Sequence, residues 1–141
     1  MIETFETVSK AVADPSRVRI LKLLEPGELC VCQITAVLGL ATATISKHLA
    51  ALKVAGLLQQ RRDGKWVYYR LADRAFNPYA PRFLAMVAAS LEDDPTIAED
   101  RRLLSLVDQV PVQVLCDQGR AALPAGLVSD TPGASCCEGP R

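Results

Sequence analysis

Several features that would assign the chain to a common class are missing from its sequence. The 141 residues contain no apolar run approaching the ~18 residues of a membrane span. Residues 1–6 include Glu3 and Glu6 and lack the basic and apolar regions of a signal peptide. The five cysteines are odd in number, which argues against a disulfide framework. We therefore expect a cytoplasmic protein with reduced thiols and no membrane partner.

Signatures of enzymes are also scarce. No Cys-x-x-Cys motif lies in a strand–helix–strand unit, and no glycine-rich loop is available to cradle a phosphate. His48 is the single histidine, which leaves little equipment for acid–base catalysis. We expect no enzymatic activity and no organic cofactor; a thiol-dependent reductase is the enzymatic alternative.

Charge is distributed unevenly along the chain. Residues 1–91 contain 12 Lys and Arg against 7 Asp and Glu, whereas residues 92–141 contain 4 against 9. The formal charges of the two parts are therefore +5 and −5, and they cancel in the whole chain. A basic body with an acidic end favours a polyanionic partner, and chance clustering of charge on solvated faces is the alternative.

The hydrophobic pattern predicts a mainly helical α+β protein. Apolar residues at helical spacing predict helices over residues 3–13, 16–24, 28–38, 42–55, 79–91 and 97–110. Asp14-Pro15 is typical of a helix start, and Gly56 of a helix end. In the second helix Lys22 falls on the side away from the apolar face. In the fourth, Ile45, Leu49 and Leu52 are expected to face the core.

The pattern changes between residues 57 and 71, where two short runs flank Asp63-Gly64. Asp-Gly between such runs is a strong hairpin signal. Two helices, a short helix, a turn, a helix and a hairpin form the order of a winged helix-turn-helix with a two-stranded wing. A generic small α+β domain is the alternative.

This fold would place one helix in the DNA major groove and the hairpin on the adjacent backbone, so that double-stranded DNA is the expected partner. The expected groove contacts are Thr42, Thr44, Ser46, Lys47 and His48. Those of Ser46 and His48 rest partly on the resemblance of the Ile-Ser-Lys-His-Leu motif to a known family, and packing at the helix edge is the alternative for His48. The expected phosphate contacts are Arg61, Arg62 and Lys65 of the hairpin, which add affinity and salt dependence more than sequence choice. An ordinary exposed basic hairpin is the alternative for the wing.

Residues 1–110 are expected to form one DNA-binding and dimerisation domain. The helix over residues 79–91 is more apolar than so small a domain needs to bury, which favours a C-terminal dimerisation helix and a homodimer. Glycine and proline punctuate residues 111–141, so this segment is expected to be a mobile, cysteine-containing tail.

Cys30 and Cys32 lie one residue apart at the expected start of the third helix. Thiolates select soft ions, and the absence of imidazole or clustered carboxylates nearby disfavours harder ones. Residues two apart on a helix point about 200° away from each other, since each residue turns ~100°. Capture of one ion by both is therefore expected to unwind the start of this helix and to tilt the groove helix. The alternatives are two buried small hydrophobes or a redox pair.

A third thiolate would have to come from another part of the chain. Cys136 and Cys137 lie near the end of the expected tail, whose flexible reach from residue 110 is on the order of 28 Å. Cys116 lies closer to the domain. Each of the three is a candidate ligand, and each has the alternative of taking no part.

Several ordered motifs resemble the ArsR/SmtB family of metal-responsive repressors. They are Ala-Asp-Pro-Ser-Arg-Val-Arg-Ile-Leu at 13–21, Leu-Gly-Leu at 38–40, Ile-Ser-Lys-His-Leu at 45–49, Ala-Gly-Leu-Leu at 55–58 and Arg-Asp-Gly-Lys at 62–65. Glu-Leu-Cys-Val-Cys at 28–32 resembles the binding box of the arsenite-responsive branch. The resemblance implies a repressor that dimerises through its first and fifth helices and leaves a palindromic operator when Cys30 and Cys32 bind As(III) or Sb(III).

The sequence departs from the family pattern at three places. Thr35 stands where the arsenite branch commonly has a third cysteine. Ala41 replaces the usual capping Ser or Thr, so Thr42 is expected to cap the groove helix. With His48 as the single histidine, the histidine and carboxylate sites for zinc, nickel or cobalt of other branches are not expected.

Overall fold

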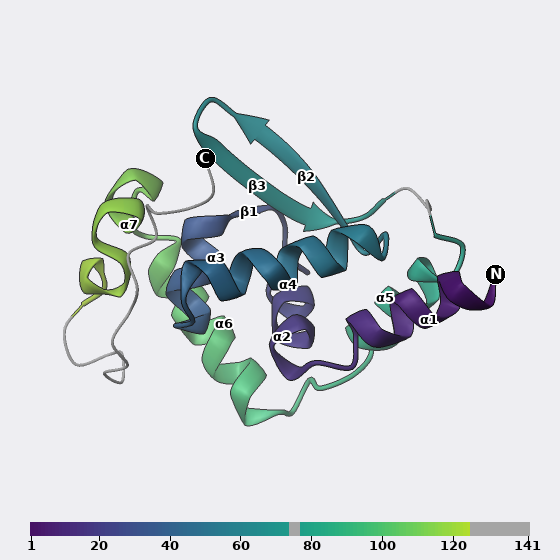
Figure 1. Ribbon diagram of the computed structural model, residues 1–141. Helices are drawn as coiled ribbons and strands as arrows, with labels where there is room; N and C mark the ends of the chain where they lie inside the picture. The colour runs from purple at the N-terminus through teal and green to yellow at the C-terminus, as the bar shows by residue number, and fades with distance from the viewer. Residues whose placement is uncertain (74–76, 125–141) are drawn as a thin grey trace.

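A computed structural model describes residues 1–73 and 77–124 (Figure 1). The elements in chain order are α1 (Ile2–Ala11), α2 (Pro15–Leu23), β1 (Leu29–Cys30), α3 (Val31–Leu38), α4 (Thr42–Val54), β2 (Leu58–Asp63), β3 (Trp66–Leu71), α5 (Ala80–Ala88), α6 (Pro95–Val107), α7 (Val112–Gln118) and the short 3-10 helix η1 (Gly119–Ala122). The predicted winged helix-turn-helix with a two-stranded wing is confirmed.

The helices begin and end at the expected chemical signals. The Asp14 carboxylate accepts hydrogen bonds from the backbone N–H groups of Ser16 and Arg17 at 2.8 and 3.2 Å, which caps α2. At the end of α3, Gly39 adopts φ 70°, a left-handed conformation that favours glycine. The chain then bends by 115° between α3 and α4.

The helix-turn-helix is held by the core. Ile45, Leu49 and Leu52 of α4 are fully buried, as predicted, and Ile34 and Val37 of α3 are buried with them. A movement of α3 therefore has to be followed by α4, because close-packed interiors yield little. No single helix within residues 1–73 and 77–124 has the length and apolarity to cross a membrane, although α3 and α4 taken together, bent as they are, would match in length and composition.

The sheet has three antiparallel strands in the order β1-β3-β2. Asp63 pairs with Trp66 around Gly64, which gives the predicted wing. The prediction of a single helix over residues 28–38 is wrong at its start, because Leu29 and Cys30 pair with Tyr69 and Tyr68 of β3. This long-range pairing overrides the helical pattern of the segment, and the helix begins only at Val31.

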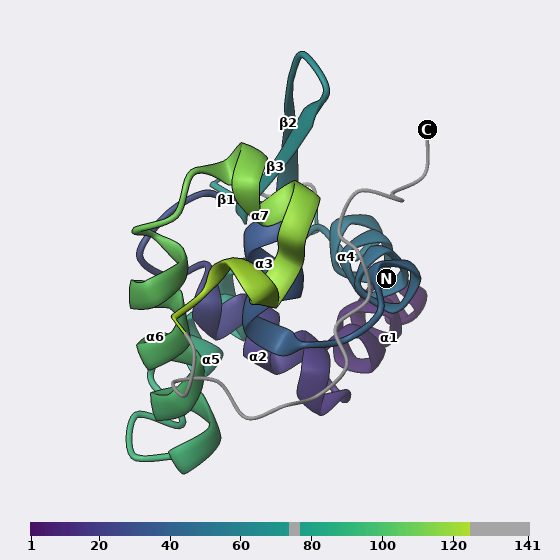
Figure 2. The same ribbon diagram turned by 90° about the vertical axis from the view of Figure 1, so that its left-hand side faces the viewer.

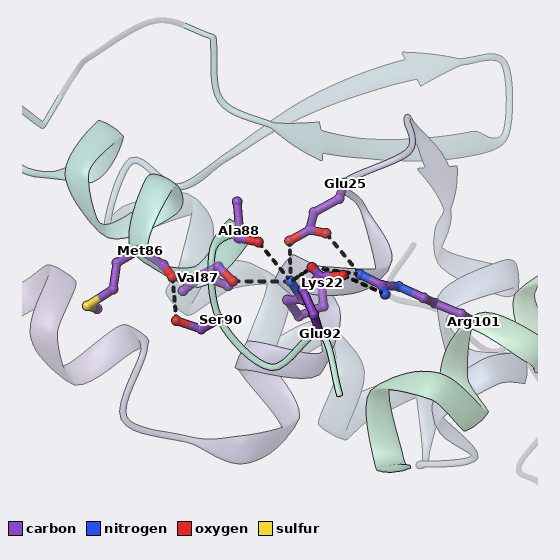
Figure 3. A network of polar contacts seen from close by, with 8 residues as sticks. All are labelled: Lys22, Glu25, Met86, Val87, Ala88, Ser90, Glu92 and Arg101. Atoms are coloured by element: carbon purple, nitrogen blue, oxygen red, sulfur yellow. Dashed lines mark hydrogen bonds and ion pairs between the residues drawn. The ribbon is translucent and has the colours of Figure 1, made fainter. Parts of the chain in front are cut away.

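Helices α2 and α5 are joined through a buried lysine (Figure 3). Lys22 of α2, 2% exposed, donates from Nζ to the carbonyl oxygens of Val87 and Ala88 at 3.2 and 3.3 Å. It also contacts carboxylate oxygens of Glu25 at 2.9 Å and Glu92 at 3.1 Å. Burial acts most strongly and lowers the pKa of Lys22, but these two carboxylates together outweigh it, so that the pKa is raised. Lys22 therefore stays charged and fixes the end of α5 to α2.

The segment expected to be a mobile tail begins with ordered structure. Residues 112–122 form α7 and η1, which pack against α3 beside α6 (Figure 2). The helix is too short for its sequence pattern to stand out, and the burial of Leu115 and Cys116 against the domain stabilises it. Cys136 and Cys137 lie outside the described residues.

Candidate thiol site and DNA-binding surface

The two cysteines of the Cys-x-Cys motif lie at the junction of the wing sheet and the helix-turn-helix. Cys30 ends β1 in an extended conformation, with φ −74° and ψ 151°, and Cys32 lies in the first turn of α3. The Cys30 backbone N–H donates to Oε1 of Gln33 at 2.8 Å. Because Cys30 is already extended, the expectation that both thiols start inside a helix is wrong, and only the turn that carries Cys32 would have to change.

Burial sets the chemistry of the free thiol. Cys30 is 1% exposed and Cys32 is 4% exposed. Burial raises the pKa of the Cys30 thiol, and backbone hydrogen bonds at Cys32, Val67 and Val31 lower it by less. The Cys30 sulfur is therefore a neutral thiol at neutral pH.

A third cysteine reaches the same place from the C-terminal side. Cys116 of α7 lies with its Cα 5.4 Å from that of Cys32, and the two sulfurs are joined in a disulfide. The expectation that no cysteines pair is wrong for these two. Within residues 1–73 and 77–124, no group of three or more His, Cys, Asp or Glu side chains is arranged to hold a metal ion.

The same C-terminal segment contacts the other end of α3. Arg120 of η1 donates from its guanidinium to the carbonyl oxygens of Ala36 and Val37, both at 2.8 Å. These carbonyls belong to the last turn of α3, where helical partners are lacking. A Cβ on Gly39 would lie 2.7 Å from the Arg120 guanidinium, so Arg120 fills the space beside the turn into α4. The sequence did not single out Arg120.

The groove helix exposes only part of the predicted set. Thr44 and Lys47 are exposed, and Ser46 and His48 are half-buried. Thr42 is 5% exposed, which removes it from the side chains available to a base edge. The N-cap of α4 is Ala41, and Thr42 is the first residue of the helix and not its cap.

His48 is oriented by a residue that sequence reasoning did not connect to it. Arg17 of α2 donates from Nε to Nδ1 of His48 at 3.2 Å, and from NH1 to the Lys10 carbonyl oxygen at 3.3 Å. Because Nδ1 accepts, the neutral ring carries its proton on Nε2, an assignment that follows from the hydrogen bond. The chain thus holds a ring donor at a defined place on the groove helix.

The three basic side chains of the wing are exposed but not equivalent. Arg61 forms a two-pronged ion pair with Glu28 and lies over the Tyr68 ring, 4.6 Å from its centre. Lys65 lies over the Trp66 ring at 4.7 Å. Since Glu28 already neutralises Arg61, Arg62 and Lys65 are better placed to meet phosphates. The hydrogen bonds from Arg61 also hold the pKa of Glu28 below its ordinary value.

Comparison with known proteins identifies the family. The model of bacterial regulatory proteins of the arsR family matches residues 14–60. The arsenic resistance transcriptional regulator ArsR1 of Pseudomonas putida is 42% identical over 87 residues, covering 61% of this chain and 64% of the relative. The arsenical resistance operon repressor of Escherichia coli is 39% identical over 99 residues, covering 70% and 77%. The regulator ArsR2 of P. putida is 37% identical over 109 residues, covering 75% and 90%. This chain belongs to the arsR family.

A solved structure agrees with this assignment. The homodimeric winged helix-turn-helix domain of a possible ArsR-family regulator from Mycobacterium bovis matches with a TM-score of 0.54 and 36% identity, over 62% of this chain and 78% of that one. The present ArsR-family chain is accordingly a winged-helix transcription regulator and not an enzyme. The resemblance found in the sequence is confirmed.

Proposed function

We propose that this ArsR-family regulator is a homodimeric repressor that binds double-stranded operator DNA when metal-free and dissociates when Cys30 and Cys32 bind As(III) or Sb(III). The observation that carries the proposal is the position of two buried cysteines, Cys30 and Cys32, at the junction of the wing sheet and α3; reduction would release Cys32 from its disulfide with Cys116. Three relatives named for arsenic or arsenical resistance support the choice of effector. We infer a cytoplasmic location, where both DNA and reduced thiols are found.

The proposed switch acts on the first turn of α3. One ion bound to both sulfurs requires Cys32 to turn toward the side of Cys30, which disturbs the hydrogen bond between the Cys30 N–H and Gln33. α3 packs on α4 through a dense core, so a shift at its start tilts the groove helix. A coupling free energy of ~1–3 kcal/mol corresponds to about 5- to 150-fold weaker operator binding.

The proposed DNA surface follows from exposure. Thr44, Ser46, Lys47 and the Nε2–H of His48 would contact base edges and nearby phosphates in the groove. Arg62 and Lys65 would contact phosphates beside it, with a smaller part for Arg61. The hairpin of β2 and β3 lies next to α4, above it in Figure 1, so the proposed groove and phosphate contacts come from neighbouring elements, in line with the docking geometry of a winged helix.

The proposed dimer surface is formed by α1 and α5. Phe5 of α1 makes edge-to-face contacts with Tyr79 and Phe83, with ring centres 5.3 and 5.7 Å apart. Beside this cluster Ile2 and Met86 are exposed at 77% and 54%. Two helices that leave large apolar side chains in solvent favour burial against a second copy.

Fluorescence anisotropy tests the proposal directly. The full-length protein, reduced with a phosphine because dithiols themselves bind arsenite, is titrated onto duplex DNA that the metal-free protein has selected from a random library. Arsenite should weaken binding of the unaltered protein, and neither Cys30→Ser nor Cys32→Ser should respond. Equal affinity with and without arsenite for the unaltered protein would reject the proposal.

A further inference from the structure

We propose that Cys116 supplies the third thiolate of the arsenic site, and that Arg120 positions the helix that carries it. The inference rests on the proposed function, since it names the remaining ligand of that same site. It makes α7 and η1 part of the sensor, although both lie in the segment that sequence reasoning set apart from the domain.

The geometry places this C-terminal segment along the whole of α3. Cys116 meets Cys32 in the first turn of α3, with Cα atoms 5.4 Å apart. Arg120, four residues later, reaches the last turn through the Ala36 and Val37 carbonyls. Leu115, next to Cys116 on α7, is fully buried. Figure 2 shows α7 lying directly against α3.

The chemistry of the ion calls for a third sulfur. Trivalent arsenic forms three bonds, and Cys30 and Cys32 account for two. Thr35 has no sulfur, and its hydroxyl is engaged with the Val31 carbonyl oxygen at 2.8 Å. Cys116 is 8% exposed and already touches Cys32. A buried sulfur that already lies at Cys32 is a better partner for a soft ion than a water-derived oxygen.

The binding step balances without any change in the oxidation state of arsenic. The Cys32–Cys116 disulfide is first reduced by two electrons, with a thiol donor oxidised to its own disulfide or a phosphine to its oxide. Arsenous acid, As(OH)₃, then loses its three hydroxyls as each thiol forms a sulfur–arsenic bond. Each thiol proton leaves with a hydroxyl as water, so three thiols yield three waters.

Arg120 links this step to the turn of the DNA-binding motif. Its guanidinium binds the last carbonyls of α3 and fills the space beside Gly39, immediately before α4. When Cys116 moves to bind the ion, α7 and η1 move with it. The contacts of Arg120 then transmit this movement to the end of α3. Arg120 is thus a positioning residue, because it acts through Cys116 and α3 and not on the ion.

X-ray absorption at the arsenic edge tests the ligand set of the reduced, full-length protein. We expect three As–S bonds in the unaltered protein and in a Cys136→Ser/Cys137→Ser double variant. Cys116→Ser should show two As–S bonds and one As–O bond. Three As–S bonds in Cys116→Ser would overturn the assignment, and loss of one in the double variant would point to the tail cysteines. If Cys30→Ser and Cys32→Ser also keep every As–S bond, the proposed function fails as well.

Arg120→Gln tests the positioning role. We expect it to retain three As–S bonds at saturating arsenite but to weaken arsenite binding about tenfold, since a pre-docked α7 is lost. Arg102→Gln is the matched control, because it removes an exposed arginine of α6 that pairs with Glu99. Unchanged arsenite affinity in Arg120→Gln would overturn this part. Arg120→Lys keeps the charge but cannot donate to both carbonyl oxygens with a planar guanidinium. Its arsenite affinity should lie between that of Arg120→Gln and that of the unaltered protein.

Discussion

The Nε–H of Arg17 donates a hydrogen bond to Nδ1 of His48, joining α2 to the groove helix over 3.2 Å. The bond fixes which nitrogen of the ring is left as a donor, and it comes from α2 and not from the helix that carries His48. The proposed DNA-binding surface is therefore supported by the second helix of the domain.

Loss of this support should weaken DNA binding. Arg17→Met is expected to reduce the free energy of operator binding by about 1 kcal/mol per protomer. Operator affinity should then fall about 5-fold if one protomer of the dimer is affected and about 30-fold if both are. Anisotropy on Arg17→Met, His48→Ala and the double variant measures the coupling. We expect the double variant to bind no more weakly than His48→Ala alone. Fully additive losses would show that Arg17 acts independently of His48.

The wing arginines should separate in their salt dependence. Arg62→Gln is expected to lower the slope of log K against log salt by ~0.9 for each phosphate that the side chain no longer neutralises, with little change in sequence preference. Arg61→Gln should change the slope much less, since Glu28 already pairs with Arg61. The measurement is operator affinity between low and moderate salt. Equal slopes for both variants would contradict the prediction that Arg61, paired with Glu28, contributes less to phosphate binding than Arg62.

The buried lysine should contribute strongly to stability. Lys22→Met leaves the Val87 and Ala88 carbonyls without their donor and the carboxylates of Glu25 and Glu92 without their cation. Glu92 is exposed and regains water, but the Glu25 Oε1 atom that contacts Lys22 is buried, so we expect a loss of about 3 kcal/mol in the free energy of unfolding. Urea denaturation measures it. Lys53→Met, an exposed lysine that contacts Gln60, is the control and should change the free energy by less than about 0.5 kcal/mol.

The buried thiol predicts a pH dependence. The folded protein raises the pKa of Cys30 above its ordinary value of 9.0, so the folded state holds this proton more tightly than the unfolded chain. The resulting stability is fully present below pH 9.0 and is lost as the pH rises through the folded pKa. Urea denaturation of the reduced protein from about pH 8 to about pH 10.5 should show the free energy of unfolding decreasing. The decrease should be smaller in Cys30→Ala, which lacks the titrating thiol. Alkylation of Cys30 with a midpoint at or below pH 9.0 would contradict the prediction.

Local signals were sufficient for much of the fold. Asp14 caps α2, Asp63-Gly64 turns the wing, and the apolar stripe of α4 faces the core, because each depends on neighbours in sequence. Contacts between distant segments were not predictable in this way. The strand at Leu29 and Cys30 exists only through its pairing with β3.

The candidate site shows the same division. Cys30 and Cys32 stand out by spacing, whereas the approach of Cys116 depends on a short helix that is stabilised by docking. Lys22 falls on the polar side of its helix, yet its long stem is buried and its amine finds oxygens on α5. Thr42 was counted with the groove residues because burial of the first turn of α4 is not visible in a hydroxyl pattern.

Cys30, Tyr68 and Arg61 occupy one row across the three strands, because Cys30 pairs with Tyr68 and Tyr68 pairs with Arg61. The helix-turn-helix and the hairpin are thus both attached to this row, the first because β1 continues directly into α3 and the second because β3 pairs with β1 and β2. In the proposed switch, a disturbance at the Cys30 sulfur would therefore reach the helix-turn-helix and the wing together. Metal binding would then weaken base contacts and phosphate contacts together. It would release an operator bound mainly through its bases as readily as one bound mainly through its phosphates.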